Sequence, residues 1–322
     1  MNTITAKEFI EIECSDRSYE LEDYETETPR WCKGCGDFGV LSVVQKYLQE
    51  KQVDPESVVC CSGIGCSSRL PHYMKTYGFH SIHGRALPVA TGVSLMRPDL
   101  QVLVVMGDGD CFSIGGNHWL HSARYNMNAT VLVLDNEVYA LTKKQVSPTT
   151  QPGTLTNTTP RGAYVGGLNP LSVYMGISNR SFLAQTATWL PGHLDQTIRA
   201  AWEHNGLSFV RVLQRCPVFM PDAFEAGGAN FPALFLDGGE DGIPVEKGFL
   251  KKAPTVKHDF TDVNAAQKIA QTPDMEPMGL IYKNTETPTY QEIRQSRIAQ
   301  LSRSELVNKL NAELTKYSVQ PK

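Results

Sequence analysis

The sequence predicts an α/β fold in which helices cover both faces of a parallel sheet. Residues 101–106 (QVLVVM) and 129–134 (ATVLVL) are continuous apolar runs, which are typical of strands buried on both faces. A helical pattern over 113–126 connects them, and a crossover of this length implies parallel, neighbouring strands. Together with the glycine-rich turn at 107–110, these runs form a buried βαβ unit, which defines the fold class.

The other elements follow from apolar spacing and turn residues. Val40, Leu41, Val44 and Leu48 recur with helical spacing, which predicts a helix over 36–50. In chain order we also expect a strand at 57–61, a small-residue helix at 86–96, a Thr-, Pro- and Gly-rich loop at 145–170, a helix near 191–204 and a strand at 208–213. The sheet is expected to end there, and residues 217–260 are expected to be irregular.

The C-terminal part is expected to be helical. Thr261 or Asp262 can cap a short helix over 262–271. Residues 288–317 indicate a charged amphipathic helix or helix pair with a leucine stripe formed by Leu306, Leu310 and Leu314. We expect this stripe to pack on the chain's own domain, and binding of a partner is the alternative. The expected divisions are an N-terminal arm (1–30), an α/β domain (31–225) and a C-terminal extension with helices (226–322).

Composition restricts the class of protein. The 322 residues are 41% hydrophobic and 20% charged, which suits a globular chain with a sizeable core. Thirty basic residues against 34 acidic ones argue against nucleic acid or an anionic membrane as the main partner. No apolar run approaches the roughly 18 residues of a membrane helix, and the N-terminus lacks the order of a signal peptide. We therefore expect a cytoplasmic protein.

Asp108 and Asn136 follow the two buried strands and indicate a metal and phosphate site. The carboxyl ends of parallel neighbouring strands share the sheet edge at which α/β proteins bind ligands. A carboxylate and an amide oxygen suit Mg²⁺, with phosphates and waters completing its shell. Gly107 and Gly109 let the backbone approach an anion, and a helix beginning near Ser113 can offer its first amides to a diphosphate. A plain turn with an Asn cap is the alternative.

Four of the eight cysteines are candidate metal ligands. Disulfides are rare in the cytosol. Cys32 and Cys35 form a C-x-x-C before a helix, Cys66 lies in the turn GIGCSS, and Cys216 ends a strand. Four such thiolates can hold zinc or an iron–sulfur cluster, and the spacing does not separate the two. The remaining cysteines are expected to be packing residues: Cys14, Cys60, Cys61 and Cys111.

Longer stretches around these residues resemble a known enzyme family. GDGDCFSIGGNHWL followed by LDNEVYALTKKQVSPTT resembles the thiamine diphosphate motif, in which GDG precedes an Asn at a set distance. YALTKKQVSPTT, RWCKGCGDFGVL, SGIGCSSRLPHYMKTYGFHSIHGRALPVATG, GLNPLSVYMG and QRCPVF resemble the β subunits of the 2-oxoacid:ferredoxin oxidoreductases. The resemblance spans roughly residues 30–225, and HSIHGRALPVATG and SIGGNHW are most similar to the 2-oxoglutarate branch.

This resemblance implies a set of site residues. Mg²⁺ would be bound by the side chains of Asp108 and Asn136 and the carbonyl of Val138. The residues expected to contact thiamine diphosphate are Ile64, Gly65, Cys66, Ser67, His83, Gly109, Asp110, Ala140 and Leu141. The ligands of a single [4Fe–4S] cluster would be Cys32, Cys35, Cys66 and Cys216. For His83, a structural, hydrogen-bonded role is the alternative.

The resemblance also implies a reaction and partners. Thiamine diphosphate holds the electrons left when a 2-oxoacid loses CO₂. A cluster lets those electrons leave one at a time toward ferredoxin, while the acyl unit passes to coenzyme A. We find no glutamate here to activate the thiamine and no fused C-x-x-C-x-x-C-x-x-x-C run. The family supplies the glutamate from an α subunit, so the chain alone is expected to be inactive.

The substrate prediction rests on this similarity to the 2-oxoglutarate branch and on Lys143. This residue follows the metal ligands closely and can pair with a substrate carboxylate, which favours 2-oxoglutarate with its second carboxylate. A solvent-facing loop lysine is the alternative. Lys144 and Lys33 depart from the glycine and proline common in relatives, which weakens the substrate prediction more than the class. Pyruvate or another 2-oxoacid, a non-redox thiamine diphosphate lyase with a structural Cys₄ zinc, and a non-catalytic scaffold are the alternatives.

Overall fold

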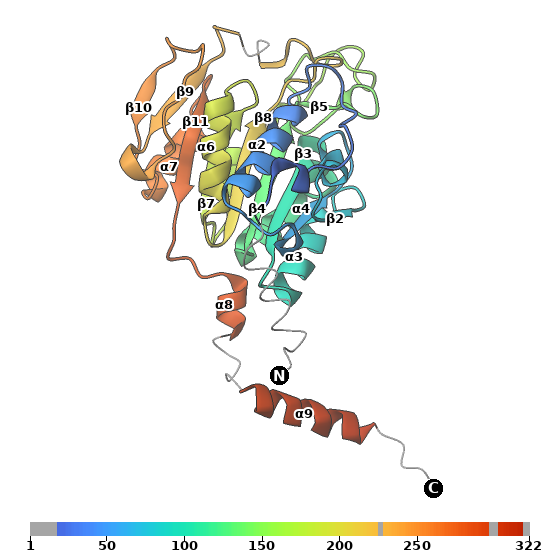
Figure 1. The fold of residues 1–322 in the computed structure, drawn as a ribbon. Coiled ribbons are helices and arrows are strands. Elements are labelled where there is room, and N and C mark those ends of the chain that lie inside the picture. Colours follow the sequence, from blue (N-terminus) through green and yellow to red (C-terminus); the bar gives the residue numbers. More distant parts are fainter. Residues whose placement is uncertain (1–17, 225–227, 296–301, 318–322) are drawn as a thin grey trace.

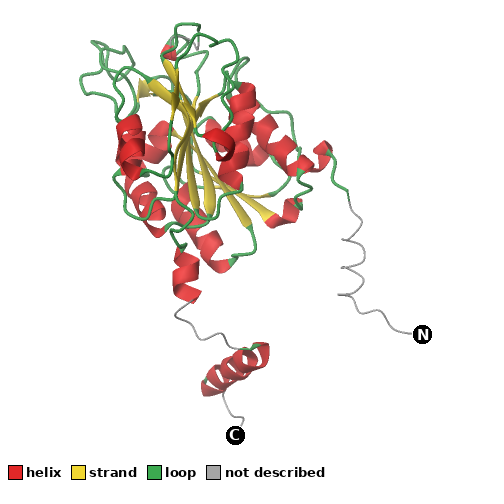
Figure 2. Cartoon of the chain, turned by 90° about the vertical axis from the view of Figure 1, so that its left-hand side faces the viewer, coloured by secondary structure: helices red, strands yellow, loops and turns green. Residues whose placement is uncertain are grey.

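A nine-stranded sheet runs through the chain in the order β10-β9-β11-β7-β8-β4-β3-β1-β2. The structure is a computed structural model and describes residues 18–224, 228–295 and 302–317. Helices lie on both faces of the sheet (Figures 1 and 2). The predicted α/β class is therefore confirmed.

Six strands form a wholly parallel part of this sheet. They are β1 (Val58–Ser62), β2 (Tyr77–His80), β3 (Gln101–Gly107), β4 (Ala129–Asp135), β7 (Phe182–Ala187) and β8 (Leu207–Leu213). β3 and β4 pair in register from Leu103 opposite Thr130 to Gly107 opposite Leu134. The predicted βαβ unit is thus confirmed, and Asp108 and Asn136 follow strands that end at the same edge.

Each face of the sheet has its own apolar core. The helices on one face are α2 (Asp37–Glu50) and α6 (Pro191–Trp202), and those on the other are α3 (Ala86–Met96), α4 (Gly116–Tyr125), α5 (Pro170–Met175) and α7 (Val263–Ala270). Strand side chains alternate between them, because successive residues of a strand point to opposite faces. Leu103 and Leu132 therefore pack toward α2 and α6, whereas Val104 and Val133 pack toward the other helices.

Several short elements connect the helices and strands. A small antiparallel ribbon joins β5 (Val138–Tyr139), which precedes the expected long loop at 145–170, and β6 (Gln145–Val146), which begins it. One π-helical turn, η4 (Asp110–Ile114), precedes α4. The 3₁₀ turns are η1 (Leu21–Asp23), η2 (Pro55–Ser57), η3 (Ser67–Tyr73) and η6 (Gly239–Asp241).

The expectation that the sheet ends after β8 is wrong. β11 (Glu276–Lys283) pairs antiparallel with β7, which the sequence did not indicate, and β9 (Ala233–Asp237) and β10 (Thr255–Lys257) extend the sheet further. The sequence EPMGLIYK contains Pro and Gly, both disfavoured in strands. Pairing with a segment about 90 residues away, which no local pattern reveals, overrides that preference.

The C-terminal region is a pair of helices, α8 (Tyr290–Gln295) and α9 (Arg303–Lys316). Leu310 and Leu314 are each 60% exposed, so the expectation that the stripe packs on the domain is wrong for these two residues, and α9 lies apart from the sheet (Figure 1). A local capping box between Ser302 and Glu305 starts this helix without tertiary packing. In the described ranges no helix is long and apolar enough to cross a membrane. The domain limits near 30 and 225 stay predictions.

Candidate cofactor and metal site

A cavity of about 220 Å³ lies at the carboxyl ends of β1, β3 and β4. Its walls come from three loops, which follow β1, β3 and β4 and are joined by His83 after β2. The lining residues are Ile64, Gly65, Cys66, Ser67, His83, Gly107, Asp108, Gly109, Asp110, Asn136, Val138, Tyr139, Ala140, Leu141 and Thr142. All the residues expected to touch the cofactor or Mg²⁺ therefore meet in one cavity, although their roles as ligands stay predictions.

The turn after β3 becomes helical earlier than predicted and packs tightly against the cavity wall. The π-helical turn η4 begins at Asp110, three residues before Ser113, with Gly109 at its N-cap. π-helical turns occur frequently at functional sites. The hydroxyl of Tyr139 donates a hydrogen bond of 3.0 Å to the Gly109 carbonyl, and a Cβ at this glycine would overlap the tyrosine ring. Glycine is thus required here by close packing. Tyr139, which the sequence analysis did not single out, forms part of the wall.

Asp110 ties two loops of the cavity together. Its Oδ1 accepts hydrogen bonds from the amides of Ile64 (3.2 Å) and Gly84 (2.7 Å). His83 Nδ1 lies 2.6 Å from the same oxygen, a close polar contact without full hydrogen-bond geometry. Burial raises the pKa of Asp110, and its Oδ2 has no hydrogen-bond partner among the described residues. His83 therefore holds a structural contact and faces the cavity at the same time.

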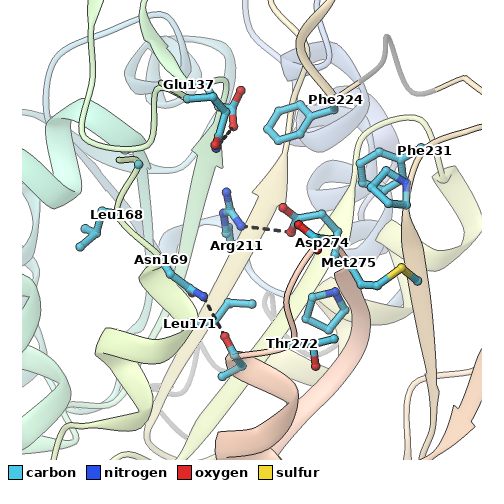
Figure 3. Close-up of a pocket in the computed structure, with 16 residues that line it drawn as sticks. Glu137, Leu168, Asn169, Leu171, Arg211, Phe224, Phe231, Thr272, Asp274 and Met275 are labelled. Atoms are coloured by element: carbon cyan, nitrogen blue, oxygen red, sulfur yellow. Dashed lines mark hydrogen bonds and ion pairs between the residues drawn. The ribbon is translucent and has the colours of Figure 1, made fainter. Parts of the chain in front are cut away.

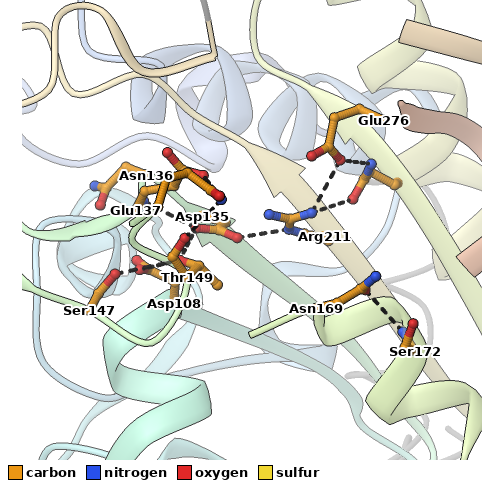
Figure 4. Close-up of polar contacts among 12 residues, drawn as sticks. Asp108, Asp135, Asn136, Glu137, Ser147, Thr149, Asn169, Ser172, Arg211 and Glu276 are labelled. Carbon is orange, nitrogen blue, oxygen red and sulfur yellow. Dashed lines mark hydrogen bonds and ion pairs between the residues drawn. The ribbon is translucent and has the colours of Figure 1, made fainter. Parts of the chain in front are cut away.

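Buried negative charge beside this cavity suits a divalent cation. Asp108 is 2% exposed and Asp135 is fully buried, and both contact the hydroxyl of Thr149 (Figure 4). Burial and the neighbouring charge of Asp135 raise the pKa of Asp108. Arg211 pairs with Asp135 and leaves the charge of Asp108 to be balanced from the cavity side. Because a buried carboxylate is costly without a counter-charge, these residues fit Mg²⁺.

The next ligand candidates follow β4. Asn136 lines the cavity, and its side-chain oxygen accepts a 3.2 Å hydrogen bond from the Val138 amide. Glu137, between them, points instead into a second cavity of about 470 Å³, where Arg211 also lies (Figure 3). Burial raises the pKa of Glu137 to about 7, and Gln151 donates to its carboxyl group. The segment therefore presents successive side chains to two different cavities.

The sequence analysis did not identify Thr149 and Arg211 as functional residues. Arg211 offers a signal, since it is the one charged residue in the buried strand β8, LSFVRVL. Thr149 offers none by itself, because it is one of several threonines in a long polar loop.

The four candidate cluster cysteines gather next to the cavity. Cys66 lies close enough to Cys32, Cys35 and Cys216 for their charges to interact. Burial raises the pKa of the Cys66 thiol to about 11. Within the described ranges no three His, Cys, Asp or Glu side chains stand close enough to share a single metal ion.

Amide donors point at two of these sulfurs. Gln214 Nε2 donates to Cys35 Sγ at 3.1 Å, and the backbone amide of Phe219 donates to Cys216 Sγ at 3.5 Å. Hydrogen bonds to sulfur are a feature of cysteine-bound iron–sulfur clusters. The donor set therefore fits a cluster. The other described cysteines are fully buried in the two cores, as expected: Cys60, Cys61 and Cys111. Cys14 lies outside the described residues.

Lys143 is not brought into the cavity wall, which ends at Thr142. Lys143 is exposed, and both Lys143 and Lys144 have positive φ angles, 72° and 68°. Asn157 holds the turn by hydrogen bonds to both lysine carbonyls. The role of Lys143 with substrate stays a prediction.

Known proteins match the chain over these same segments. The family described as "Thiamine pyrophosphate enzyme, C-terminal TPP binding domain" matches residues 63–212, which contain the cavity loops. A second family, described as the C-terminal part of the pyruvate ferredoxin oxidoreductase β chain, matches residues 249–297. The chain therefore carries a thiamine diphosphate-binding domain.

Individual relatives are similar over most of the chain. A 2-oxoacid:ferredoxin oxidoreductase β subunit from Aeropyrum pernix is 35% identical over 84% of this chain and 85% of its own. The 2-oxoglutarate oxidoreductase subunit KorB of Mycobacterium tuberculosis is 44% identical over 67% of this chain, which spans 58% of that relative. The solved structure of the 2-oxoglutarate:ferredoxin oxidoreductase from Magnetococcus marinus, with 2-oxoglutarate, coenzyme A and succinyl-CoA bound, aligns with a TM-score of 0.76 at 34% identity, over 91% of this chain and 97% of that chain. The chain belongs to the β subunits of the 2-oxoacid:ferredoxin oxidoreductases.

Proposed function

We propose that this chain is the thiamine diphosphate-binding β subunit of a CoA-dependent 2-oxoglutarate:ferredoxin oxidoreductase. The observation that carries the proposal is the single cavity in which the loops after β1, β3 and β4 meet, beside four cysteines. Relatives named for 2-oxoglutarate support the substrate, among them the subunits KorB of M. tuberculosis and of Methanocaldococcus jannaschii.

Different residues around the cavity would bind the metal ion, the diphosphate and other polar groups. Asp108, Asn136 and the Val138 carbonyl would hold Mg²⁺, and the ion would in turn hold the diphosphate. The glycine-containing turn before α4 would let the backbone approach that diphosphate, and the first amides of η4 would be available as hydrogen-bond donors to it. His83 faces the cavity while Asp110 fixes its ring, so His83 can position a polar group of cofactor or substrate. When bound, thiamine diphosphate supplies the electron sink for decarboxylation.

Cys32, Cys35, Cys66 and Cys216 would hold a [4Fe–4S] cluster next to that cavity. Cys66 belongs both to the cavity wall and to the cysteine group, so it links the two sites. A one-electron carrier in this place favours oxidation of the decarboxylated substrate over its simple protonation. Ferredoxin is the proposed final acceptor.

An α subunit is the proposed partner, because among the described residues no glutamate lines the cavity to activate the thiamine. Several apolar side chains close to the cavity are left exposed, as expected for a surface covered by a partner. They include Ile82, Ile114 and Leu141.

The test is to co-express the chain with its α subunit, purify the complex without oxygen and follow CoA-dependent viologen reduction. We expect higher kcat/KM with 2-oxoglutarate than with pyruvate or branched-chain 2-oxoacids, and no activity from the chain alone. Equal or better turnover of pyruvate would overturn the substrate, and full activity of the lone chain would overturn the need for a partner.

Metal content tests the cluster separately. We expect a brown complex with iron and labile sulfide, and Cys66→Ala should lose both. Cys60→Ala is the matched control, since Cys60 is buried in the core on the α2 face and should keep the full iron content. A colourless complex with one zinc per chain would instead indicate the non-redox lyase.

A further inference from the structure

Thr149 bridges two buried carboxylates beside the proposed magnesium site. Its Oγ1 lies 2.9 Å from Asp108 Oδ2 and 2.7 Å from Asp135 Oδ1, and the threonine itself is 1% exposed (Figure 4). A hydroxyl group has one proton, so it can donate to only one of the two oxygens at a time. The second contact is favourable when a cation nearby offsets the repulsion between oxygens, or when one of the two carboxyl groups carries a proton.

Asp135 is the fixed end of this bridge. Arg211 Nε donates to its Oδ2 at 2.7 Å, and the Glu137 amide donates to its Oδ1 at 3.1 Å. The guanidinium is held in turn by Gln185 and by Glu276, at 3.1 and 3.3 Å from Nη1. Neither Asp135 nor Arg211 lines the proposed cofactor cavity. They therefore form a hydrogen-bonded support behind its wall.

Asp108 is the end that faces the cavity. Its carboxylate also accepts hydrogen bonds from the Ser147 side chain and the Gly109 amide, and these two donors are the contacts that would remain without the bridge. Contact with Thr149 fixes Oδ2 and thereby sets the orientation in which the carboxylate meets an ion in the cavity. Side chains that orient a metal ligand in this way typically contribute about 10- to 100-fold in metal affinity.

We propose that Thr149 is a positioning residue for the metal ligand Asp108, and that Arg211 acts on the same ligand through Asp135. The hydroxyl, rather than the size of the side chain, carries this role. The proposal rests on the proposed binding of Mg²⁺ by Asp108, and it adds that the ion's affinity depends on a hydrogen-bonded support which extends to β8.

The experiment uses the αβ complex stripped with EDTA and then titrated with Mg²⁺ at a fixed concentration of thiamine diphosphate. Binding is followed by tryptophan fluorescence and calorimetry, without substrate. Thr149→Val keeps the shape and removes the hydroxyl, whereas Thr149→Ser keeps the hydroxyl. The matched control is Thr197→Val, because Thr197 is fully buried on α6 and donates to the His193 carbonyl, on the face opposite α4.

We expect Thr149→Val to raise the half-saturating Mg²⁺ concentration by roughly 10- to 100-fold, with the serine variant within about threefold of the parent and the control unchanged. If Thr149→Val does not fold, Thr149→Ser and Thr149→Ala can be compared instead, because they also differ in the hydroxyl group. Unchanged Mg²⁺ binding by the variant without a hydroxyl, or an equal loss in the serine variant, overturns the proposal. Asp108→Ala distinguishes failure of the positioning role from failure of the proposed metal site. If this variant still binds Mg²⁺ and cofactor normally, the proposed metal site itself is wrong.

Discussion

Replacing Arg211 by methionine tests the buried support most directly. Arg211 is 5% exposed and its partner Asp135 is fully buried, with 2.7 Å between Nε and Oδ2. Methionine fills much of the same volume and removes the charge, which leaves Asp135 buried with only neutral donors. Breaking a buried ion pair on one side costs about 3–5 kcal/mol. We expect a loss of this size in the local stability of β4 and β8.

Hydrogen exchange of the intact αβ complex measures this loss. A change of about 3–5 kcal/mol should speed exchange of the β4 and β8 amides by about two to four orders of magnitude. Arg97→Met is the matched control, since Arg97 pairs with Asp99 at 2.6 Å but both side chains are 59% exposed. An exposed pair contributes about 0–1 kcal/mol, so little change is expected there.

The double variant supplies the decisive comparison. Asp135→Asn removes the buried charge that Arg211→Met leaves unpaired, so the two changes together should cost less than Arg211→Met alone. If Arg211→Met is as mild as Arg97→Met, or if Asp135→Asn adds to its cost, the ion pair does not stabilise the strands as we infer.

Three further outcomes are expected. Gly109→Ala should abolish thiamine diphosphate binding because its Cβ overlaps Tyr139, whereas Gly116→Ala, with no atom within 4 Å of its Cβ, should bind normally in calorimetry. Burial lowers the pKa of His193 to about 4, so between pH 6.5 and 4 only the unfolded state takes up the proton. His193 should therefore contribute a loss of about 2 kcal/mol in stability from pH 7 to pH 5 in urea unfolding, and His193→Gln should remove that contribution from the pH dependence. Lys144→Gly should gain up to about 1 kcal/mol in the same assay by relieving a φ of 68°, and a loss would mean that the lysine side chain contributes packing.

Much of the cofactor cavity was predictable because its residues lie in short, contiguous segments. The apolar runs that became β3 and β4 are buried on both faces, and this burial leaves a local signature in the sequence. Once those strands are parallel neighbours, Asp108 and Asn136 have to meet at one edge. The resemblance added His83 and the GIGCSS turn, which the structure places in the same cavity.

Other features depended on contacts between distant segments. Thr149 is one threonine in a polar loop until folding places it between two carboxylates that lie 41 and 14 positions away in the chain. β11 carries Pro and Gly and becomes a strand only by pairing with β7. The leucine stripe of α9 has the periodicity of a packed helix, yet Leu310 and Leu314 meet no core.

The sequence by itself thus determined the fold class, the sheet edge and the segments that line the cofactor cavity. Only the tertiary structure decided which polar groups support those segments, where the sheet ends and which apolar stripe finds a partner. The physical reason is that a buried segment shows its burial in the spacing of its own apolar residues. A hydrogen bond or strand pairing across tens of residues depends on where the rest of the chain comes to lie.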